Sequence, residues 1–418
     1  MTSLLHTART ALSAPVHRIY LALLIALTIF WIGAAHSAVS ANECNGGAYR
    51  DLSMAELAYS DISALHADRG CQPHALPFIG DRVEYPVLLA LAMWAPSQFA
   101  PTGTGYFLVS ALMLAIAVIV MGVALFHIDG ANPWVMLASP ALYVYGTLNW
   151  DLIALAALAV GLALVPPEAA VGGSTKPMPK IVYWSMLAIA FGVWTKLFPA
   201  VGVVALLVVA WRRYGLKSAV LLGLLFAAIS VLLNAPFALL AFENWSYFFK
   251  FNGTRQIDPS IYTLVGLDPQ RDIGIANKVS FLLLATAALF VAFTEFRSKH
   301  GKIAVMTGFL LVIWLVGNKV FSPQYWIWAL FAYAIAGGRT WIGLTAGVLA
   351  VLENLSVFSM LSQKGYGFML NWQPWFKERY WDFVHLRYIV FIGLAVDIGF
   401  KLWRSSTKAK TEPKGVAA

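Results

Sequence analysis

Charged residues are scarce in this chain of 418 residues. Asp, Glu, Lys and Arg together make up 12% of the sequence, whereas 60% of its residues are hydrophobic. A soluble domain carries roughly 25% charged residues, and a protein of this length could not cover a water-facing surface with so few ionisable groups. The scarcity of charge excludes a soluble fold and predicts an all-α polytopic membrane protein whose partner is the lipid bilayer.

The sequence has only two cysteines and no recognisable nucleotide-binding loop. No glycine-rich loop of the Gly-x-Gly-x-x-Gly or Walker type is evident. The two cysteines, Cys44 and Cys71, fall in one polar segment, and two cysteines do not supply the four ligands of a structural zinc site. We therefore expect no metal and no cofactor. If the segment lies on the oxidising side of a membrane, a disulfide is favoured over two unpaired thiols.

Acidic residues are outnumbered by basic ones, since 29 Lys and Arg face 20 Asp and Glu and give a net charge of +9. Such an excess can indicate nucleic-acid binding, but here the basic residues lie in short clusters between apolar runs, which is the pattern of cytoplasmic loops. We expect no nucleic-acid partner. The clusters comprise Arg9 with Arg18, Arg212 with Arg213 and Lys217, Arg297 with Lys299 and Lys302, Arg339, and Lys401 with Arg404, Lys408, Lys410 and Lys414.

The apolar runs predict about twelve membrane-spanning helices in one domain that covers residues 1–404. A spanning helix needs about 20 apolar residues, or fewer where neighbouring helices shield its ends. The polar end at 405–418 is expected to be a disordered cytoplasmic tail. The expected helices cover residues 20–38, 106–126, 134–147, 152–165, 181–194, 198–211, 219–241, 276–296, 303–316, 325–336, 341–360 and 386–403.

The short apolar run at 85–94 is expected to be a re-entrant or interfacial segment, because it is short and Pro86, Pro96 and Pro101 lie within or just after it. With this segment not crossing and the basic clusters inside, both termini are cytoplasmic and residues 39–104 form a long extracytoplasmic loop with this segment at its end. Residues 37–41 also resemble a signal-peptide cleavage site, so removal of the first helix stays open.

The loop at 39–104 concentrates acidic residues. Its middle, residues 54–69, has apolar residues at helical spacing and predicts an amphipathic helix on the membrane surface. Such a helix can hold Asp61 at the mouth of a cavity, and Glu84 supplies a second carboxylate. The alternative is that these side chains are merely solvated.

Three breaks between predicted helices on the extracytoplasmic side carry ionisable or polar residues. Lys196 precedes a proline, Lys319 precedes a Ser-Pro pair, and Asn149 and Asp151 flank a tryptophan at a third break. Charges at such depth are expensive and often line a cavity or bind an anion, although a single lysine can also be a snorkelling anchor. The repetition at three breaks favours one shared polar cavity.

Two further extracytoplasmic segments contribute candidates. The aromatic stretch at 242–275 is either an interfacial belt or a platform for a sugar ring or lipid chain. Its Arg255 is a candidate phosphate ligand because a guanidinium makes bidentate contacts. Gln324 and Tyr325 end the helix break that contains Lys319, and His385 belongs to the last extracytoplasmic loop. We expect these three residues to line the substrate cavity.

Five short motifs run in order through most of the chain. They are Tyr59-Ser60-Asp61-Ile62, Val83-Glu84-Tyr85-Pro86-Val87-Leu88, Asn149-Trp150-Asp151-Leu152, Thr195-Lys196-Leu197-Phe198-Pro199 and Lys319-Val320-Phe321-Ser322-Pro323-Gln324-Tyr325. The ordered set resembles the actinobacterial GT-C membrane glycosyltransferases of family GT87, which include mycobacterial polyprenol-phosphate-mannose-dependent α-mannosyltransferases.

The resemblance implies a GT-C type helix bundle, a lipid-linked sugar donor, a large first outer loop and a catalytic Asp in that loop, which falls on Asp61. It also implies a bacterial plasma membrane with the active site on the extracytoplasmic face. The sugar and the acceptor do not follow from it, and Cys44 and Cys71 correspond to no pattern of the family.

The resemblance implies transfer of a sugar, with mannose expected, from a polyprenyl-phosphate donor to a cell-envelope glycolipid or glycan, and the candidate residues fit this chemistry. Asp61, with Glu84 in reserve, would take the proton of the acceptor hydroxyl. Lys196, Lys319 and Arg255 would balance the charge of the leaving phosphate. Direct displacement inverts the anomeric configuration. No metal is required, although the two carboxylates could bind a divalent ion.

Three alternatives stay open. A decaprenyl-phosphate arabinofuranose donor would use the same mechanism. A transporter or flippase of lipid-linked sugars would place polar groups at mid-membrane within inverted repeats, whereas here they cluster at one face and no repeat is seen. A structural scaffold would have no need for lysines and acids at helix breaks.

Overall fold

Helices are the only regular secondary structure in the part of the chain that the structure describes. Six of them are long and apolar enough to cross a membrane, which supports a multi-pass membrane protein. They are α2 (Val16–Ser37), α6 (Gly103–His127), α12 (Leu216–Leu240), α15 (Ile273–Arg297), α18 (Thr340–Leu361) and α20 (Tyr380–Thr407). The computed structural model describes 19 helices and no sheet over residues 16–167, 177–298, 302–362 and 369–407.

Five other predicted helices correspond to shorter elements of 11 to 15 residues. Every residue of the last one from Trp326 to Ile335 is buried. Neighbouring helices therefore shield these short elements, as their length requires. They are α9 (Asp151–Ala163), α10 (Ile181–Thr195), α11 (Ala200–Tyr214), α16 (Ile303–Gly317) and α17 (Tyr325–Ile335).

The single helix expected at 134–147 is wrong. The chain forms two short helices instead, α7 (Trp134–Leu137) and α8 (Ala141–Tyr145), and Pro140 is the N-cap of the second. Proline has no N–H to donate, and its ring clashes with the carbonyl four residues earlier. Pro140 therefore prevents one continuous helix through this segment.

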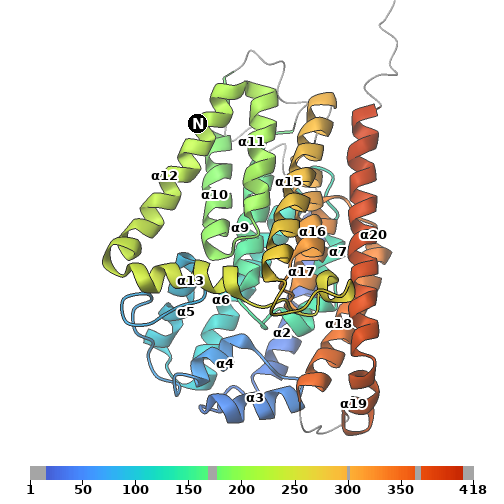
Figure 1. Ribbon diagram of the computed structural model, residues 1–418. Helices are drawn as coiled ribbons and strands as arrows, with labels where there is room; N and C mark the ends of the chain where they lie inside the picture. The colour runs from blue at the N-terminus through green and yellow to red at the C-terminus, as the bar shows by residue number, and fades with distance from the viewer. Residues whose placement is uncertain (1–15, 168–176, 299–301, 363–368, 408–418) are drawn as a thin grey trace, which may run out of the picture.

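The bundle has a polar end, which we call the loop end and which lies at the bottom of Figure 1. The hairpin between α11 and α12 and the last turn of α20 lie at the opposite end. In the bundle between the two ends, α9 packs against α6 and α10, and α16 packs against α17 and α20. The helices of the loop end are α3 (Gly46–Ala55), α4 (Asp61–Ala67), α5 (Val87–Phe99), α13 (Phe242–Thr254), α14 (Ile261–Leu264) and α19 (Met369–Glu378).

The surface helix expected at 54–69 is also wrong, because two helices share this segment. α3 ends at Ala55, Leu57 adopts a left-handed φ of 57°, and Ser60 caps α4 through a hydrogen bond from the Ile62 N–H. A branched residue at positive φ cannot continue a right-handed helix. Most of α4 is buried against α3 and α6 rather than lying on a surface.

The predicted re-entrant run at 85–94 forms the 13-residue helix α5, with Pro96 inside it. Its length of about 20 Å is shorter than the hydrocarbon core of about 30 Å, as is that of α9 with the same 13 residues, so the expectation that this segment does not cross stays a prediction. The predicted tail at 405–418 begins too early, because α20 continues to Thr407. Residues 408–418 and the N-terminal residues 1–15 lie outside the described residues.

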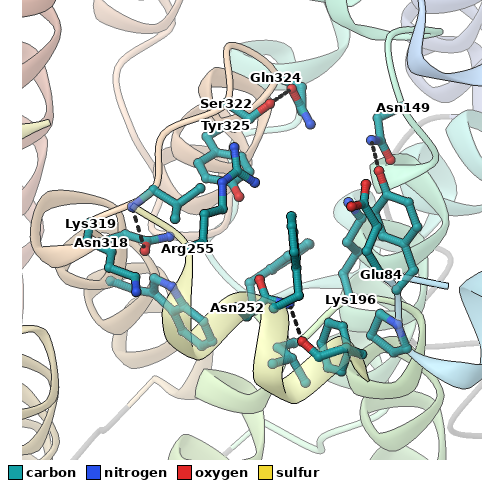
Figure 2. A pocket seen from close by; sticks show the side chains of 18 of the residues that line it. Glu84, Asn149, Lys196, Asn252, Arg255, Asn318, Lys319, Ser322, Gln324 and Tyr325 are labelled. Carbon is teal, nitrogen blue, oxygen red and sulfur yellow. Dashed lines mark hydrogen bonds between the residues drawn. The ribbon is translucent and has the colours of Figure 1, made fainter. Parts of the chain in front are cut away.

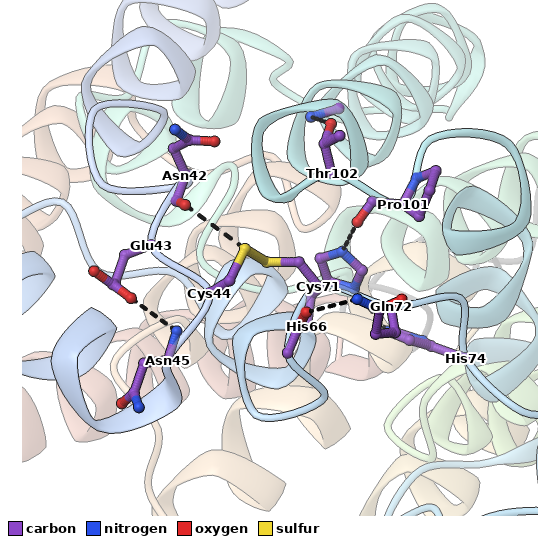
Figure 3. Close-up of a disulfide and its surroundings, with 12 residues drawn as sticks. Asn42, Glu43, Cys44, Asn45, His66, Cys71, Gln72, His74, Pro101 and Thr102 are labelled. Carbon is purple, nitrogen blue, oxygen red and sulfur yellow. Dashed lines mark hydrogen bonds between the residues drawn. A yellow bond between two sulfur atoms is a disulfide. The ribbon is translucent and has the colours of Figure 1, made fainter.

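A disulfide joins Cys44 to Cys71 with their Cα atoms 5.3 Å apart (Figure 3). It ties the start of the first loop to the segment just after α4, with 27 residues of sequence separation. Behind it, His66 and His74 form a buried contact of 2.9 Å between Nδ1 and Nε2, and His66 stacks on the ring of Tyr106. The loop therefore has a compact core of its own.

Candidate functional site

A cavity of about 430 Å³ opens at the loop end, and segments far apart in the sequence line it. Figure 2 shows Glu84, Asn149 and Lys196 on one side and Arg255 and Lys319 on the other, with α13 between them. We call Asp61, Glu84, Asn149 and Lys196 the carboxylate wall, and Arg255, Lys319, Gln324 and Tyr325 the cation wall. All eight residues line the cavity.

Asp61 is the most firmly held residue of the carboxylate wall. Its backbone N–H donates to the Leu148 carbonyl at 2.8 Å, which brings the first turn of α4 against the break before α9. The Tyr59 hydroxyl donates to Oδ1 at 2.9 Å, and Asn149 Nδ2 donates to Oδ2 at 2.8 Å. Two donors from different segments therefore fix both carboxylate oxygens at the edge of the cavity.

The environment of Asp61 favours a proton acceptor. Burial raises the pKa of the Asp61 carboxyl above its ordinary value, while the hydrogen bonds from Asn149 and Tyr59 and the charge of Lys196 oppose the shift. A carboxylate with a raised pKa takes up a proton more readily than an exposed one. The site thus holds an oriented base whose proton affinity exceeds that of a solvated aspartate.

Glu84 differs from Asp61 in having no hydrogen-bond or ion-pair partner among the described residues. Its side chain is half-buried. Burial raises the pKa of Glu84, and the charge of Arg255 opposes the shift. Asp61 is positioned and Glu84 is not, so the two carboxylates of the cavity are suited to different tasks.

Lys196 is positioned by an ion pair with Asp151. The two form an ion pair of 3.0 Å between Nζ and Oδ1, and Trp328 Nε1 donates to the other oxygen of Asp151 at 2.9 Å. The ammonium also lies 4.6 Å from the ring centroid of Tyr85. Asp151 is fully buried and does not line the cavity, so the structure places it as a partner of Lys196 rather than as a surface of the substrate cavity.

The cation wall is built from two loops joined through Asp258. Arg255 forms an ion pair with Asp258 at 3.1 Å, and Lys319 Nζ donates to the Gly253 carbonyl at 3.0 Å. Burial and the like charge of Arg255 lower the pKa of Lys319, while Asp258 opposes the shift. Two cations with a single carboxylate between them form a site that favours an anion.

The remainder of the cation wall comes from the start of α17. Ser322 Oγ donates to Gln324 Oε1, and the ring of Tyr325 stacks on Trp328 with centroids 4.0 Å apart. His385 is absent from the cavity lining. Its side chain is exposed on α20, and its Nδ1 lies 2.7 Å from the Trp381 carbonyl. The structure therefore does not bring His385 to this cavity.

Sequence reasoning missed two contributions to the site. Phe251 and Asn252 of α13 line the cavity beside Phe248, which belongs to the aromatic stretch considered as a platform, and their spacing of three to four residues is the signal that marks one helix face. Glu353 and Arg387 form a buried ion pair behind the cation wall. Glu353 is a single acidic residue within an apolar run, which is itself a sign of a buried partner.

No group of three or more His, Cys, Asp or Glu side chains within the described ranges could hold a metal ion. Comparison of the chain with models of protein families, with curated proteins and with solved structures finds no match. The functional argument therefore depends on the geometry and chemistry of the cavity.

Proposed function

We propose that the chain is a membrane glycosyltransferase. It would transfer a sugar, with mannose as the first expectation, from a polyprenyl-phosphate donor to a cell-envelope glycolipid or glycan on the extracytoplasmic face, with inversion. The observation that carries the proposal is one cavity in which Asp61, held through both oxygens, and the Arg255 and Lys319 pair line the same space.

The chemistry requires a base and a site for a leaving anion. The acceptor hydroxyl would attack the anomeric carbon and give its proton to Asp61, while the bond from that carbon to the phosphate oxygen breaks. The phosphodiester would leave as a polyprenyl phosphomonoester, which gains negative charge. Arg255 and Lys319 would stabilise that charge, because fixed cations in a water-poor site need little rearrangement.

A lipid-linked donor fits the setting of the cavity. The cavity lies at one end of a bundle that contains six long apolar helices. A polyprenyl chain would remain in the bilayer while its phosphate and sugar enter from the loop end. The family resemblance of the motifs around Asp61, Glu84, Asn149, Lys196 and Lys319 supports the same donor class.

The test is a transfer assay on purified protein in lipid. Polyprenyl-phosphate mannose and polyprenyl-phosphate arabinose are offered separately with a membrane glycolipid extract, and the product is detected by mass spectrometry. We expect mannose transfer by the wild type and its loss in Asp61→Asn. Asp51→Asn is the matched control, because Asp51 is an exposed acid of the same loop that does not line the cavity.

Each outcome distinguishes a different hypothesis. Arabinose transfer that Asp61→Asn abolishes would keep the mechanism and change the donor sugar. Unchanged turnover in Asp61→Asn would remove this carboxylate from the role of base. No transfer by folded wild-type protein from either donor would contradict the proposed function and favour the transporter alternative.

A further inference from the structure

A buried ion pair inside the helix bundle lies next to the cation wall. Arg387 of α20 donates from one terminal nitrogen to Oε1 of Glu353 on α18, and both side chains are 1% exposed. Trp326 Nε1 of α17 donates to Oε2 of Glu353 at 2.6 Å. Removing two charges from water is unfavourable unless the geometry is good and further hydrogen bonds form. Such a pair is therefore weak evidence for stability alone, and its other contacts indicate a different role.

Arg387 also touches both loops of the cation wall. Its second terminal nitrogen donates to the Pro259 carbonyl at 2.5 Å, and Pro259 directly follows Asp258. Its guanidinium carbon lies 3.4 Å from the ring centroid of Phe321, two residues after Lys319. Arg387 itself does not line the cavity.

Asp258 also connects the same two loops. Its backbone N–H donates to the Lys319 carbonyl at 2.9 Å, and its Oδ2 accepts from the Phe321 N–H at 3.3 Å. The same oxygen pairs with Arg255. Asp258 and Arg387 thus both hold together the two loops that carry the cavity cations.

We propose that the Glu353 and Arg387 pair is a positioning device for the anion site of the cavity. The pair holds the loops at 253–260 and 317–324 at the spacing at which Arg255 and Lys319 contact one phosphate group together. A guanidinium is needed because its planar fork contacts the carboxylate, the Pro259 carbonyl and an aromatic face at once, which an ammonium cannot do. The identity of the anion rests on the proposed function.

The test measures binding of decaprenyl phosphate, without sugar, to full-length protein in lipid nanodiscs. We expect Arg387→Lys to weaken binding about tenfold, because the charge remains but the bridge between the loops is lost. In the transfer assay the same variant raises the KM for the donor and leaves kcat within about twofold. The thermal midpoint of Arg387→Lys should lie within a few degrees of that of the control variant Glu295→Gln.

The control is Glu295→Gln, which weakens another buried ion pair, between Glu295 of α15 and Arg212 of α11 at the opposite end of the bundle. We expect this variant to lose stability without any change in decaprenyl-phosphate binding. If it weakens binding as much as Arg387→Lys does, general loosening of the bundle explains the effect and the proposal is overturned.

A double-mutant comparison separates positioning from general stability. If Arg387 acts through the two cations, Arg387→Lys has no further effect on binding in an Arg255→Met, Lys319→Met background. An equal loss in both backgrounds would overturn the proposal. If Arg387→Lys does not fold, Trp326→Phe removes the hydrogen bond to Glu353 and keeps an aromatic ring at this buried position, and about a threefold weakening is expected; unchanged binding would again overturn it.

The two proposals fail in distinguishable ways. Wild-type protein that binds decaprenyl phosphate but transfers no sugar would contradict the glycosyltransferase and leave the positioning role intact. Wild-type protein that transfers sugar, with an unchanged donor KM in Arg387→Lys, would contradict the positioning role alone. Absence of decaprenyl-phosphate binding to the wild type would overturn the positioning role as stated.

Discussion

The carboxylate wall and the cation wall face one cavity, but different parts of the molecule hold them. Asp61 lies in the first loop and is fixed by short contacts from Tyr59 and Asn149. Arg255 and Lys319 depend on Asp258 and on an ion pair buried among α17, α18 and α20. The first loop and the break before α9 therefore position the candidate base, whereas α17, α18 and α20 support the candidate anion site, so perturbing one should leave the other largely intact.

The largest expected effect lies in the carboxylate wall and separates its two acids. Asp61→Asn should lower the transfer rate by about 10³-fold, since an amide cannot take the acceptor proton. Glu84→Gln should lower it about tenfold or less, because nothing among the described residues orients Glu84. Initial rates at saturating donor are the measurement. A greater loss in Glu84→Gln would exchange the roles of the two carboxylates.

The next effect separates the two lysines. Lys196→Met leaves the buried carboxylate of Asp151 without its ion-pair partner, and removal of one partner from a buried pair is destabilising by about 3 kcal/mol or more. Lys319→Met removes only a contact with a carbonyl and should mainly weaken donor binding. Thermal unfolding in nanodiscs and donor KM, measured on both variants, check the contrast. Equal thermal midpoints would contradict it.

The disulfide gives a smaller effect that should be confined to the loop. Cys44→Ser with Cys71→Ser removes the cross-link that closes a 27-residue separation, and disulfides of this kind contribute about 3 kcal/mol in the entropic account. We expect faster hydrogen exchange in residues 42–75 and a lower transfer rate, with unchanged decaprenyl-phosphate binding. Alkylation with and without reductant comes first, since two freely alkylated thiols in unreduced protein would exclude the bond.

The smallest effect is a pH dependence of the same loop. Burial lowers the pKa of His66 below 6.5 and lowers that of His74 to about 3. The Nδ1 to Nε2 contact between them holds one proton, so both rings cannot be charged together. Between pH 6.5 and about 3 the unfolded loop binds more protons than the folded loop, so stability falls as the pH falls through that window.

For His74, whose pKa falls from 6.5 to about 3, this pH effect amounts to about 1 kcal/mol at pH 5.5. Hydrogen exchange of the loop amides at pH 7 and 5.5 measures it, with rates corrected for intrinsic pH dependence. His74→Gln should remove part of the difference in loop stability between the two pH values. The charges of Arg69 and Asp81 also act on the pKa of His74, in opposite directions. An identical loop stability at both pH values would contradict the prediction.

Hydropathy predicted the positions of most helices, because each long apolar run is a local property of the chain. It failed at 134–147 and 54–69, where a proline and a left-handed Leu57 interrupt the pattern. The candidate site was predictable wherever a charge stood at a helix break, as for Lys196 and Lys319. It was not predictable for His385, since the exposed face of α20 that carries this residue depends on tertiary packing.

The amino-acid sequence by itself determined the class of protein, the order of the apolar helices and the polar residues available for a site, because hydropathy and charge are properties of neighbouring residues. Only the tertiary structure decided which of these residues meet. Asn149 reaches Asp61 across 88 residues, and Arg387 reaches Pro259 across 128. Contacts over such separations depend on how the helices pack, since a side chain meets a distant partner only when the backbones that carry both are fixed.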